Sequence, residues 1–438
     1  MANIFRTLYL LILARRRLHW DADRLRKHQE KMLRSVVRYA YDSVPFYHEK
    51  FKRCGIKPEN IKTLEDLAKI PVVRKDEFRQ QSCDRLVSRN ISLSKLRKLK
   101  TSGSTGRPLE VLISGYEDDW RKAIYMRANL FCGQKPRDKW VVIAGPAHRG
   151  DTTKIQQILG IYARKHISVF EKPAVQAQLV KKFHPDILDG YSSALCLLAK
   201  ELEKIGCECV RPKMIFGNAD VIDDLSRDFI EKIFDAPFYD QYGCVEFNRT
   251  AWQCPEKIGY HMDVDSVFTQ FVDENGEEVS AGERGRIVQT SLFNYAMPFI
   301  RYEVGDVGVF LEEKCPCGIV LPLMKEIEGR EDSFIVLPDG QVLSPRNFTV
   351  AMSMFKFYSF IEQFQIMQKR VDFFEVYLKM RKSNVDNNIV RSELVDHFVR
   401  ILNLKGINVD FNVNFVDEIP LSKSGKLMAV VSEVNRFY

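Results

Sequence analysis

The chain has 438 residues, of which 45% are hydrophobic and 28% charged, and its formal net charge is +8. This composition is typical of a folded protein large enough for more than one domain. A dedicated nucleic-acid binder would concentrate its basic charge, whereas Lys and Arg here alternate with Asp and Glu along most of the chain. The balance fits an enzyme that handles anionic ligands. The ten cysteines show no regular disulfide spacing, which favours free thiols in a reducing cytoplasm.

The first predicted element is a short apolar helix near the N-terminus. An unbroken apolar run from Leu8 to Ala14 precedes Arg15, Arg16 and Arg17. A transmembrane helix needs about 20 apolar residues, and a signal peptide carries its charge before the apolar run. Two interpretations stay open: an amphipathic helix packed on its own domain, or a membrane-surface contact with the arginines near lipid headgroups. We expect a cytoplasmic protein with at most peripheral membrane contact.

The middle of the chain predicts a layered α/β domain. Residues 20–90 have apolar positions at helical spacing, interrupted at Pro45. After residue 108, strands and helices alternate; the expected strands include 139–145, one within 177–206 and 212–220, and a helix follows at 222–234. Such alternation indicates crossover units and a parallel sheet. Ligands of these domains bind beyond the carboxyl ends of the strands.

The pattern changes twice in the second half. Residues 266–292 predict an antiparallel hairpin around Asn275-Gly276. Beyond Gly329 the order is a hairpin, a helix at 347–357, strands at 361–370 and 373–382, a helix at 389–402 and a strand at 409–420. The predicted fold class is therefore α/β, with a large layered N-terminal domain (1–329) that includes an antiparallel subdomain, and a small mobile α+β C-terminal domain (330–438).

The octapeptide "TSGSTGRP" at residues 101–108 is the first candidate functional motif. It gathers hydroxyl side chains, two glycines and Arg107 between a basic segment and a predicted strand. Such a loop can direct backbone N–H groups, hydroxyls and a positive charge toward one phosphate. The alternative is an ordinary Ser/Gly-rich hairpin turn. The octapeptide alone does not decide between them.

Four more motifs follow in order: "QYGCVEF" (241–247), "FIRYEVGD" (299–306), "EGREDSF" (328–334) and "PLSKSGKL" (420–427). Together with the first, they resemble the ordered motifs of the adenylate-forming enzymes, which include the acyl-CoA ligases. The resemblance covers roughly residues 20–430. It looks closest to the phenylacetate–CoA ligase-like branch, which includes the CapK-like proteins of polysaccharide gene clusters.

The resemblance implies an AMP-forming carboxylic-acid ligase that uses ATP and Mg²⁺. A small-molecule carboxylate would attack the α-phosphorus of ATP, and the acyl adenylate would then be passed to a thiol, such as coenzyme A, or to an amine, with polysaccharide biosynthesis as a candidate setting. The implied nucleotide-binding residues are Ser102, Gly103, Ser104, Thr105, Gly106 and Arg107 at the phosphates, Gly217, Asn218, Ala219, Tyr239 and Asp240 around adenine, Tyr242 and Gly243, and Asp306 at the ribose.

The resemblance also assigns the catalytic and hinge residues. Glu246 would hold Mg²⁺, a hard cation that prefers oxygen ligands. Arg330 would reach the ribose or phosphate, and Lys426 would bridge the α-phosphate and the substrate carboxylate. Asp332 would be the hinge on which the C-terminal domain moves between the two half-reactions.

The chain departs from the family pattern at two places. Val245 replaces the usual Thr of the "YGxTE" motif, which removes one hydroxyl contact to the nucleotide. The stretch "VLPDGQVLSP" lacks the longer hinge-loop pattern of ordinary acyl-CoA ligases, which leaves the acceptor open. Two alternative functions therefore stand beside the ligase: an adenylyltransferase that stops at an AMP adduct, and a catalytically degenerate scaffold in a polysaccharide assembly.

A separate set of residues has the chemistry of a metal site. "WQCPEKIGYH" supplies Cys254 and His261, and "CPCG" supplies Cys315 and Cys317 about sixty residues later. Three thiolates and one imidazole form a closed structural zinc set. The alternative is that these residues bind no metal. Two of them would then be free thiols, the histidine would lie at the surface, and the remaining pair would be a coincidence of the sequence. Both segments flank the antiparallel subdomain, so we expect them to lie close together, with zinc as a structural rather than catalytic ion.

Overall fold

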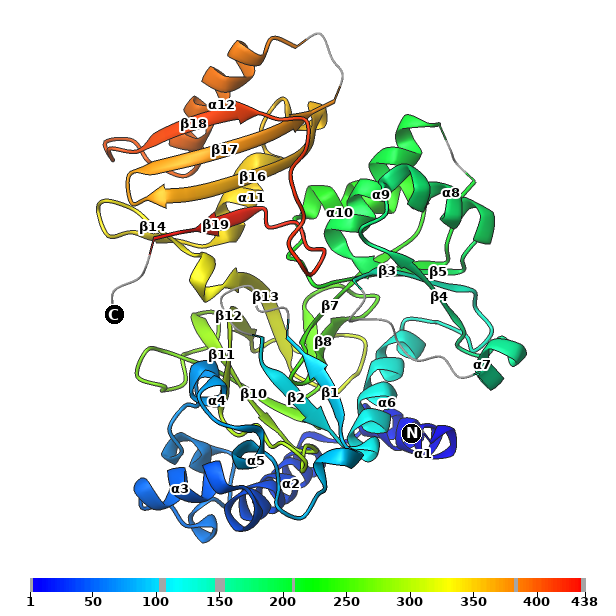
Figure 1. Cartoon of the computed structure of the whole chain (residues 1–438), viewed down its shortest axis with the longest axis vertical. Helices are drawn as coiled ribbons and strands as arrows, with labels where there is room; N and C mark the ends of the chain where they lie inside the picture. Colours follow the sequence, from blue (N-terminus) through cyan, green and yellow to red (C-terminus); the bar gives the residue numbers. More distant parts are fainter. Residues whose placement is uncertain (1–2, 102–107, 146–153, 207–208, 382–384, 435–438) are drawn as a thin grey trace. The chain divides into compact units, whose positions relative to one another are not determined.

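The computed structural model describes residues 3–101, 108–145, 154–206, 209–381 and 385–434 (Figure 1). The chain divides into two compact units. The first comprises Met1–Lys135 and Tyr239–Ile327, and the second comprises Pro136–Phe238 and Glu328–Tyr438. Each unit is therefore built from two separate stretches of sequence.

The first unit begins with helices. Their bounds are Ile4–Arg17 (α1), Ala22–Ser43 (α2), Pro45–Arg53 (α3), Lys75–Arg79 (α4), Cys83–Leu86 (α5) and Gly115–Phe131 (α6), with 3₁₀ turns at Pro58–Asn60, Glu65–Lys69 and Leu93–Lys95. Helix α2 starts where the Asp21 carboxylate accepts a hydrogen bond from the backbone N–H of Arg24. It ends just before Pro45, because the residue preceding a proline disfavours helical backbone. The predicted helical region and its interruption are confirmed.

An antiparallel sheet forms most of the rest of the first unit. Its strands are Phe238–Cys244 (β7), Asn248–Gln253 (β8), Tyr260–Met262 (β9), Val267–Val272 (β10), Arg284–Ser291 (β11), Tyr302–Leu311 (β12) and Leu323–Arg330 (β13), in the order β10-β11-β12-β13-β9-β8-β7. The predicted hairpin around Asn275-Gly276 is confirmed, because Val267 pairs with Ser291 across β10 and β11. A second hairpin pairs Arg97–Lys100 (β1) with Glu110–Ile113 (β2).

The second unit contains the predicted parallel sheet. Its strands are Trp140–Ala144 (β3), Arg164–Ser168 (β4), Ile187–Tyr191 (β5) and Met214–Asn218 (β6), in the order β6-β5-β3-β4. The connecting helices are Lys154–Leu159 (α7), Pro173–Phe183 (α8), Ser192–Lys204 (α9) and Asp224–Phe234 (α10). The predicted α/β class is confirmed.

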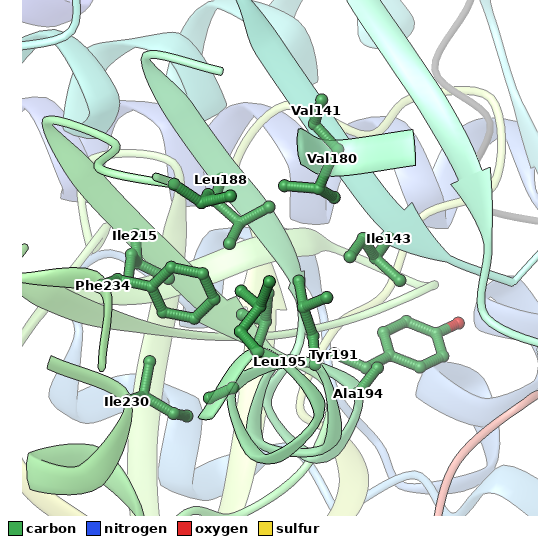
Figure 2. Packing of buried hydrophobic residues seen from close by; sticks show 14 of the residues in the cluster. Val141, Ile143, Val180, Leu188, Tyr191, Ala194, Leu195, Ile215, Ile230 and Phe234 are labelled. Carbon is green, nitrogen blue, oxygen red and sulfur yellow. The ribbon is translucent and has the colours of Figure 1, made fainter. Parts of the chain in front are cut away.

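One apolar cluster joins this sheet to the helices α8, α9 and α10. Figure 2 shows Val180 of α8, Leu195 of α9 and Phe234 of α10 directed toward Leu188 and Ile215 of the strands. All five side chains are fully buried. Burying a side chain of this size stabilises the fold by roughly 1.5–3 kcal/mol. The cluster therefore fixes the positions at which the strands end, and with them the loops beyond their carboxyl ends.

The C-terminal residues have a core of their own. The elements are Ile335–Val336 (β14), Val342–Leu343 (β15), Pro345–Ser353 (α11), Ile361–Arg370 (β16), Phe373–Met380 (β17), Asn387–Ile401 (α12), Asp410–Phe415 (β18) and Val430–Ser432 (β19), with 3₁₀ turns at Glu331–Ser333 and Tyr358–Phe360. The sheet order is β18-β17-β16-β19. Helices α11 and α12 pack on it through Phe348 and Phe398, which contact Phe374 and Phe411. The predicted α+β elements are confirmed; a domain boundary at 329/330 stays a prediction.

Among the helices that the structure describes, we find none with the length and apolar character that crossing a lipid bilayer requires.

Candidate functional site

The predicted nucleotide-site residues are divided between the two units. The proposed phosphate-loop residues Ser102, Gly103, Ser104, Thr105, Gly106 and Arg107 lie outside the described residues. The strands on either side of them pair antiparallel, with Lys100 opposite Glu110. The Thr101 hydroxyl accepts a hydrogen bond from the backbone N–H of Leu109 at 2.8 Å. The phosphate and turn interpretations of the octapeptide both stay open.

Two motifs separated by more than fifty residues meet in the first unit. The Tyr242 hydroxyl on β7 donates a hydrogen bond to the Asp306 carboxylate on β12, with 2.7 Å between the oxygens. Gly243 follows Tyr242, and a Cβ built there would lie 2.1 Å from the carbonyl oxygen of Asn248. Only glycine fits at that position. The sequence predicted both motifs as parts of one site, and the fold brings these two side chains into direct contact.

The Glu246 carboxylate lies beside the same strands. Its Oε1 atom is 2.9 Å from the Lys75 ammonium and accepts a hydrogen bond from the Tyr302 hydroxyl at 3.0 Å. Burial raises the pKa of Glu246. Attraction by Lys75, together with hydrogen bonds from Lys75, the backbone of Glu246 and Tyr302, outweighs burial and leaves that pKa below its usual value. Glu246 is therefore held as a carboxylate, the form that a divalent cation needs.

Sequence reasoning missed two basic residues around Glu246. Lys75 begins helix α4 in the segment "VVRKDEF", which carries no catalytic signature. The buried Arg121 of α6 donates to the backbone carbonyls of Val245 and Glu246 at 2.8 and 3.1 Å. Burial lowers the pKa of Arg121 to about 10. These two cations hold the backbone and the carboxylate of the "YGCVE" motif.

The predicted adenine-pocket residues of this unit are Tyr239 and Asp240, and both are buried. The Asp240 carboxylate accepts from the Tyr260 hydroxyl at 2.6 Å and from the backbone N–H of Gln241 at 3.0 Å. The Lys257 ammonium lies 5.7 Å from the ring centre of Tyr239. The Asp240 side chain is thus engaged within the unit, and adenine contacts by these residues stay a prediction.

In the second unit, the predicted segment Gly217-Asn218-Ala219 lies at the carboxyl end of β6. A Cβ on Gly217 would lie 2.0 Å from the Phe238 ring, so close packing requires glycine there. The Asn218 amide donates to the buried Asp189 carboxylate at 2.9 Å. Ala219 has a φ of +73°, a strained value for a residue with a Cβ. Strain of this kind is concentrated at functional sites.

Lys426 reaches this same strained loop. Its ammonium donates a hydrogen bond to the carbonyl oxygen of Ala219 at 3.0 Å. The tight turn that carries it closes through bonds from Gly425 N–H to the Ser422 carbonyl and from Ser422 N–H to the Lys426 carbonyl. Gly425 has a φ of +84°, and a Cβ there would lie 2.2 Å from Val169. The C-terminal lysine motif is therefore fixed against the carboxyl end of the parallel sheet.

The two remaining predicted residues lie near each other. The Arg330 guanidinium is 3.7 Å from the Asp332 carboxylate, and both side chains are partly exposed. Asp332 belongs to the 3₁₀ turn Glu331–Ser333. The turn follows directly on β13, so it stands at the start of the C-terminal elements. The roles of Arg330 in ATP binding and of Asp332 as a hinge stay predictions.

The four residues of the predicted metal set come together in the first unit. The potential ligand atoms of Cys254, His261, Cys315 and Cys317 all lie within 4.8 Å of one another. Sγ of Cys254 is 3.6 Å from Sγ of Cys315, and Sγ of Cys317 is 3.3 Å from Nε2 of His261. Zinc–sulfur bonds of about 2.3 Å in a tetrahedron place two sulfurs about 3.8 Å apart. The spacing therefore fits one tetrahedral ion.

The surroundings of this cluster orient its ligands. Nδ1 of His261 donates to the carbonyl oxygen of Leu321 at 3.2 Å, which leaves Nε2 facing Cys317. Burial raises the pKa of Cys254, and burial together with the neighbouring thiols raises that of Cys317 to about 12. Without a cation the set would hold protons, whereas a metal ion deprotonates a coordinating thiol. The residues present fit zinc in number, type and spacing.

The chain is similar to a protein-family model and to several known proteins. Residues 335–433 match the model of the CapK C-terminal domain family. A phenylacetate-coenzyme A ligase of Pseudomonas putida is 28% identical over 382 residues, covering 82% of this chain and 83% of that protein. Protein CapK of Staphylococcus aureus is 24% identical over 431 residues, covering 93% and 89%.

The similarity extends to three dimensions. A crystal structure of a 2-hydroxyisobutyryl-CoA ligase, described as in the postadenylation state with R3-HIB-AMP, superposes with a TM-score of 0.81 at 21% identity. It covers 95% of this chain and 91% of that one. The fold, together with the meeting of the "YGCVE" and "YEVGD" motifs, defines an adenylate-forming ligase. Within that class the chain is similar to the phenylacetate-coenzyme A ligases and to CapK, and the resemblance inferred from the five motifs is confirmed.

Proposed function

We propose that this chain activates a carboxylic acid with ATP and transfers the acyl group to the thiol of coenzyme A. In the first half-reaction a carboxylate oxygen attacks the α-phosphorus, and the bond to the departing pyrophosphate breaks. In the second, a thiolate attacks the acyl carbon, and AMP leaves. Relatives named as phenylacetate-coenzyme A ligases and a neighbour in complex with an acyl adenylate support this class of reaction.

The observation that carries the proposal is the hydrogen bond between Tyr242 and Asp306. A carboxylate offers about four lone-pair sites, so one that accepts from a tyrosine can also accept from the hydroxyl groups that a ribose offers. The Glu246 carboxylate, held by Lys75 and Tyr302 in the same unit, would be a ligand of Mg²⁺. Bound Mg²⁺ would neutralise charge on the phosphates.

Lys426 has the properties of the group that meets the reacting carboxylate. It is a compact point charge whose ammonium group has three donors, of which Ala219 takes one. We propose that it contacts both the α-phosphate and the substrate carboxylate, so that it stabilises the charge that develops between them. Gly217, Asn218 and Ala219 would line the adenine side, and the loop 102–107 would bind the phosphates.

We further propose that Cys254, His261, Cys315 and Cys317 hold one structural zinc ion. The convergence of their four ligand atoms within 4.8 Å supports this assignment. A closed set of four protein ligands leaves no open position for substrate, so the ion would stabilise the fold rather than act in the reaction.

The resemblance to CapK-like proteins also suggests a biological setting. We propose that the activated acid serves the modification of a polysaccharide, in which the final acceptor is an amine or hydroxyl of a sugar. Transfer to coenzyme A would then be an intermediate step. Pyrophosphate release with a panel of acids would identify the acid.

The test is pyrophosphate release measured over a panel of aromatic, hydroxylated and amino acids, with and without coenzyme A. The proposed ligase gives release that depends on one class of acid, together with an acyl thioester when coenzyme A is present. Asp306→Asn should lower both, since it weakens the contact to ribose. A stable AMP adduct without acyl transfer supports the adenylyltransferase instead. Absence of pyrophosphate release with every acid, despite ATP binding, supports the scaffold.

A further inference from the structure

Helix α1 presents an apolar stripe that the described residues leave uncovered. Its exposed side chains are Ile4, Phe5, Leu8, Tyr9 and Ile12, with exposed fractions from 41% to 81%. These five fall within nine consecutive residues, while the other exposed large apolar residues of the described chain are scattered over many elements. Exposed apolar side chains are normal singly, but a contiguous patch marks an interaction surface.

The opposite face of α1 is firmly attached, so the exposure does not come from a loose helix. Leu10, Leu11 and Ala14 are buried, and the helix packs along α6 (Figure 1). The Arg6 guanidinium donates to the buried Asp119 carboxylate at 2.7 Å. Arg127 donates to the Ala14 carbonyl at 3.1 Å. The fold therefore holds the stripe outward.

All the charged residues of this helix are basic. Residues 1–20 contain Arg6, Arg15, Arg16 and Arg17 and no acidic residue, so they carry +4 of the chain's net +8. Arg6 and Arg17 form ion pairs with Asp119 and Asp265. Arg15 and Arg16 are exposed and form no ion pair with any part of the chain that the structure describes.

The two unpaired arginines stand on the same side as the apolar stripe. At 100° per residue, the positions of Arg15 and Arg16 fall inside the arc of about 140° that runs from Ile4 to Tyr9. The stripe is roughly 12 Å long, and with the two arginines that follow it this face extends over roughly 18 Å. An apolar face with aromatic side chains and basic residues at its edge is the pattern of a helix that lies in a membrane interface.

We propose that α1 docks the protein onto an anionic lipid bilayer, with the apolar side chains of the stripe in the interface and Arg15 and Arg16 at the headgroups. A second copy of this chain is the less suitable occupant. The stripe holds no acidic side chain, so packing against its own copy would bury two guanidinium groups without counter-charges. Anionic headgroups supply the charge that the stripe lacks.

The experiment is co-sedimentation of the full chain with vesicles of 70% phosphatidylcholine and 30% phosphatidylglycerol, and with pure phosphatidylcholine vesicles. We expect binding to the anionic vesicles that weakens at high salt, and little binding to neutral ones. Arg15→Glu/Arg16→Glu should weaken binding at least about tenfold. Phe5→Ser/Tyr9→Ser should do the same, since it removes apolar area from the interface.

Two matched variants serve as controls. Lys181→Glu/Lys182→Glu makes the same charge change at adjacent exposed residues of α8, and Ile158→Ser/Leu159→Ser removes exposed apolar side chains from α7. Both should bind anionic vesicles like the unaltered chain. The proposal is overturned if the control pairs weaken binding as much as the α1 pairs, or if the chain does not sediment with anionic vesicles. A dimer that the Phe5/Tyr9 pair dissociates, with no vesicle binding, would assign the stripe to self-association instead.

Discussion

The Lys426 ammonium donates a hydrogen bond to the carbonyl oxygen of Ala219 at 3.0 Å, although 207 positions separate the two residues in the chain. Ala219 follows β6, at the carboxyl end of the parallel strands, where ligands of α/β domains bind. The lysine of the last motif therefore contacts a loop where a ligand is expected on grounds of fold alone.

The first prediction concerns this lysine. Lys426→Ala should lower the rate of pyrophosphate release by about a hundredfold or more, because the charge that bridges phosphate and carboxylate in the transition state is lost. ATP affinity and thermal stability should change little. Lys423→Ala, at an exposed position in the same turn, is the control and should keep nearly full activity. An unchanged rate in Lys426→Ala would remove the residue from the mechanism.

The second prediction concerns the ion pair between Lys75 and Glu246. Lys75→Met removes the attraction that keeps the pKa of Glu246 below its usual value, and burial then raises that pKa. Because the carboxylate form is lost as pH falls through its pKa, the acid limb of the pH–rate profile should move to higher pH. The measurement is the rate of pyrophosphate release at saturating Mg²⁺ between about pH 4 and 8, a range that includes the ordinary glutamate pKa of about 4.3.

The control for this prediction is Lys69→Met, which removes an exposed lysine paired with Asp66 a few residues earlier. Its acid limb should coincide with that of the unaltered chain. If Lys75→Met also leaves the limb in place and lowers the rate equally at every pH, then Lys75 supports the fold rather than the charge state of Glu246.

The third prediction concerns the metal set. Cys315→Ser should lower the zinc content from about one ion per chain to nearly none, and lower the melting temperature by roughly 5 °C or more. The main effect should be on thermal stability and the smaller effect on the catalytic rate, since the ion is structural. Cys54→Ser, at an exposed free thiol, should retain the metal. Protein purified without chelator that contains no metal, yet is fully stable and active, would leave the free-thiol interpretation standing.

Much of the fold could be predicted because single residues mark the ends of elements. Pro45 ends α2, and the apolar segments of β3 and β5 are recognisable as buried strands. Strand β4 was not predicted. Its sequence "RKHIS" carries three basic residues, and it is an edge strand whose Arg164 stacks at 3.9 Å over the Trp140 ring. No alternation of apolar and polar residues reveals such a strand, because its packing depends on a tryptophan elsewhere in the chain.

The site was predictable only in part for a related reason. Tyr242 and Asp306 stand in recognisable motifs, but nothing in the sequence around Lys75 indicates that it pairs with Glu246. That pair depends on how α4 packs against β12, which only the tertiary structure specifies. The metal set was predicted from residue types, while the spacing of its ligand atoms required the antiparallel strands to bring the two segments together.

The fourth prediction concerns the proposed hinge. Asp332→Pro fixes φ in the turn Glu331–Ser333 and hinders rotation there. Adenylation should survive better than acyl transfer, because one closed arrangement can persist while movement to the other is slowed. Single-turnover rates of the two half-reactions, each normalised to the unaltered chain, measure this difference. Equal losses in both, or no loss in either, would place the hinge elsewhere.

The last prediction concerns Lys200 of α9, whose ammonium donates to the backbone carbonyls of Ile361 and Glu362 at 3.0 and 2.7 Å. The contact removes the ammonium group from water, and this burial lowers the pKa of Lys200.

If the C-terminal elements move between half-reactions, these two bonds must break. Lys200→Met should therefore slow adenylation about three- to tenfold and leave acyl transfer unchanged or faster, since it weakens only the arrangement in which Lys426 meets Ala219. Lys204→Met, at an exposed position one turn further along α9, should alter neither rate. Equal slowing of both half-reactions by Lys200→Met would mean that the contact serves general stability, a result that a lower melting temperature would accompany.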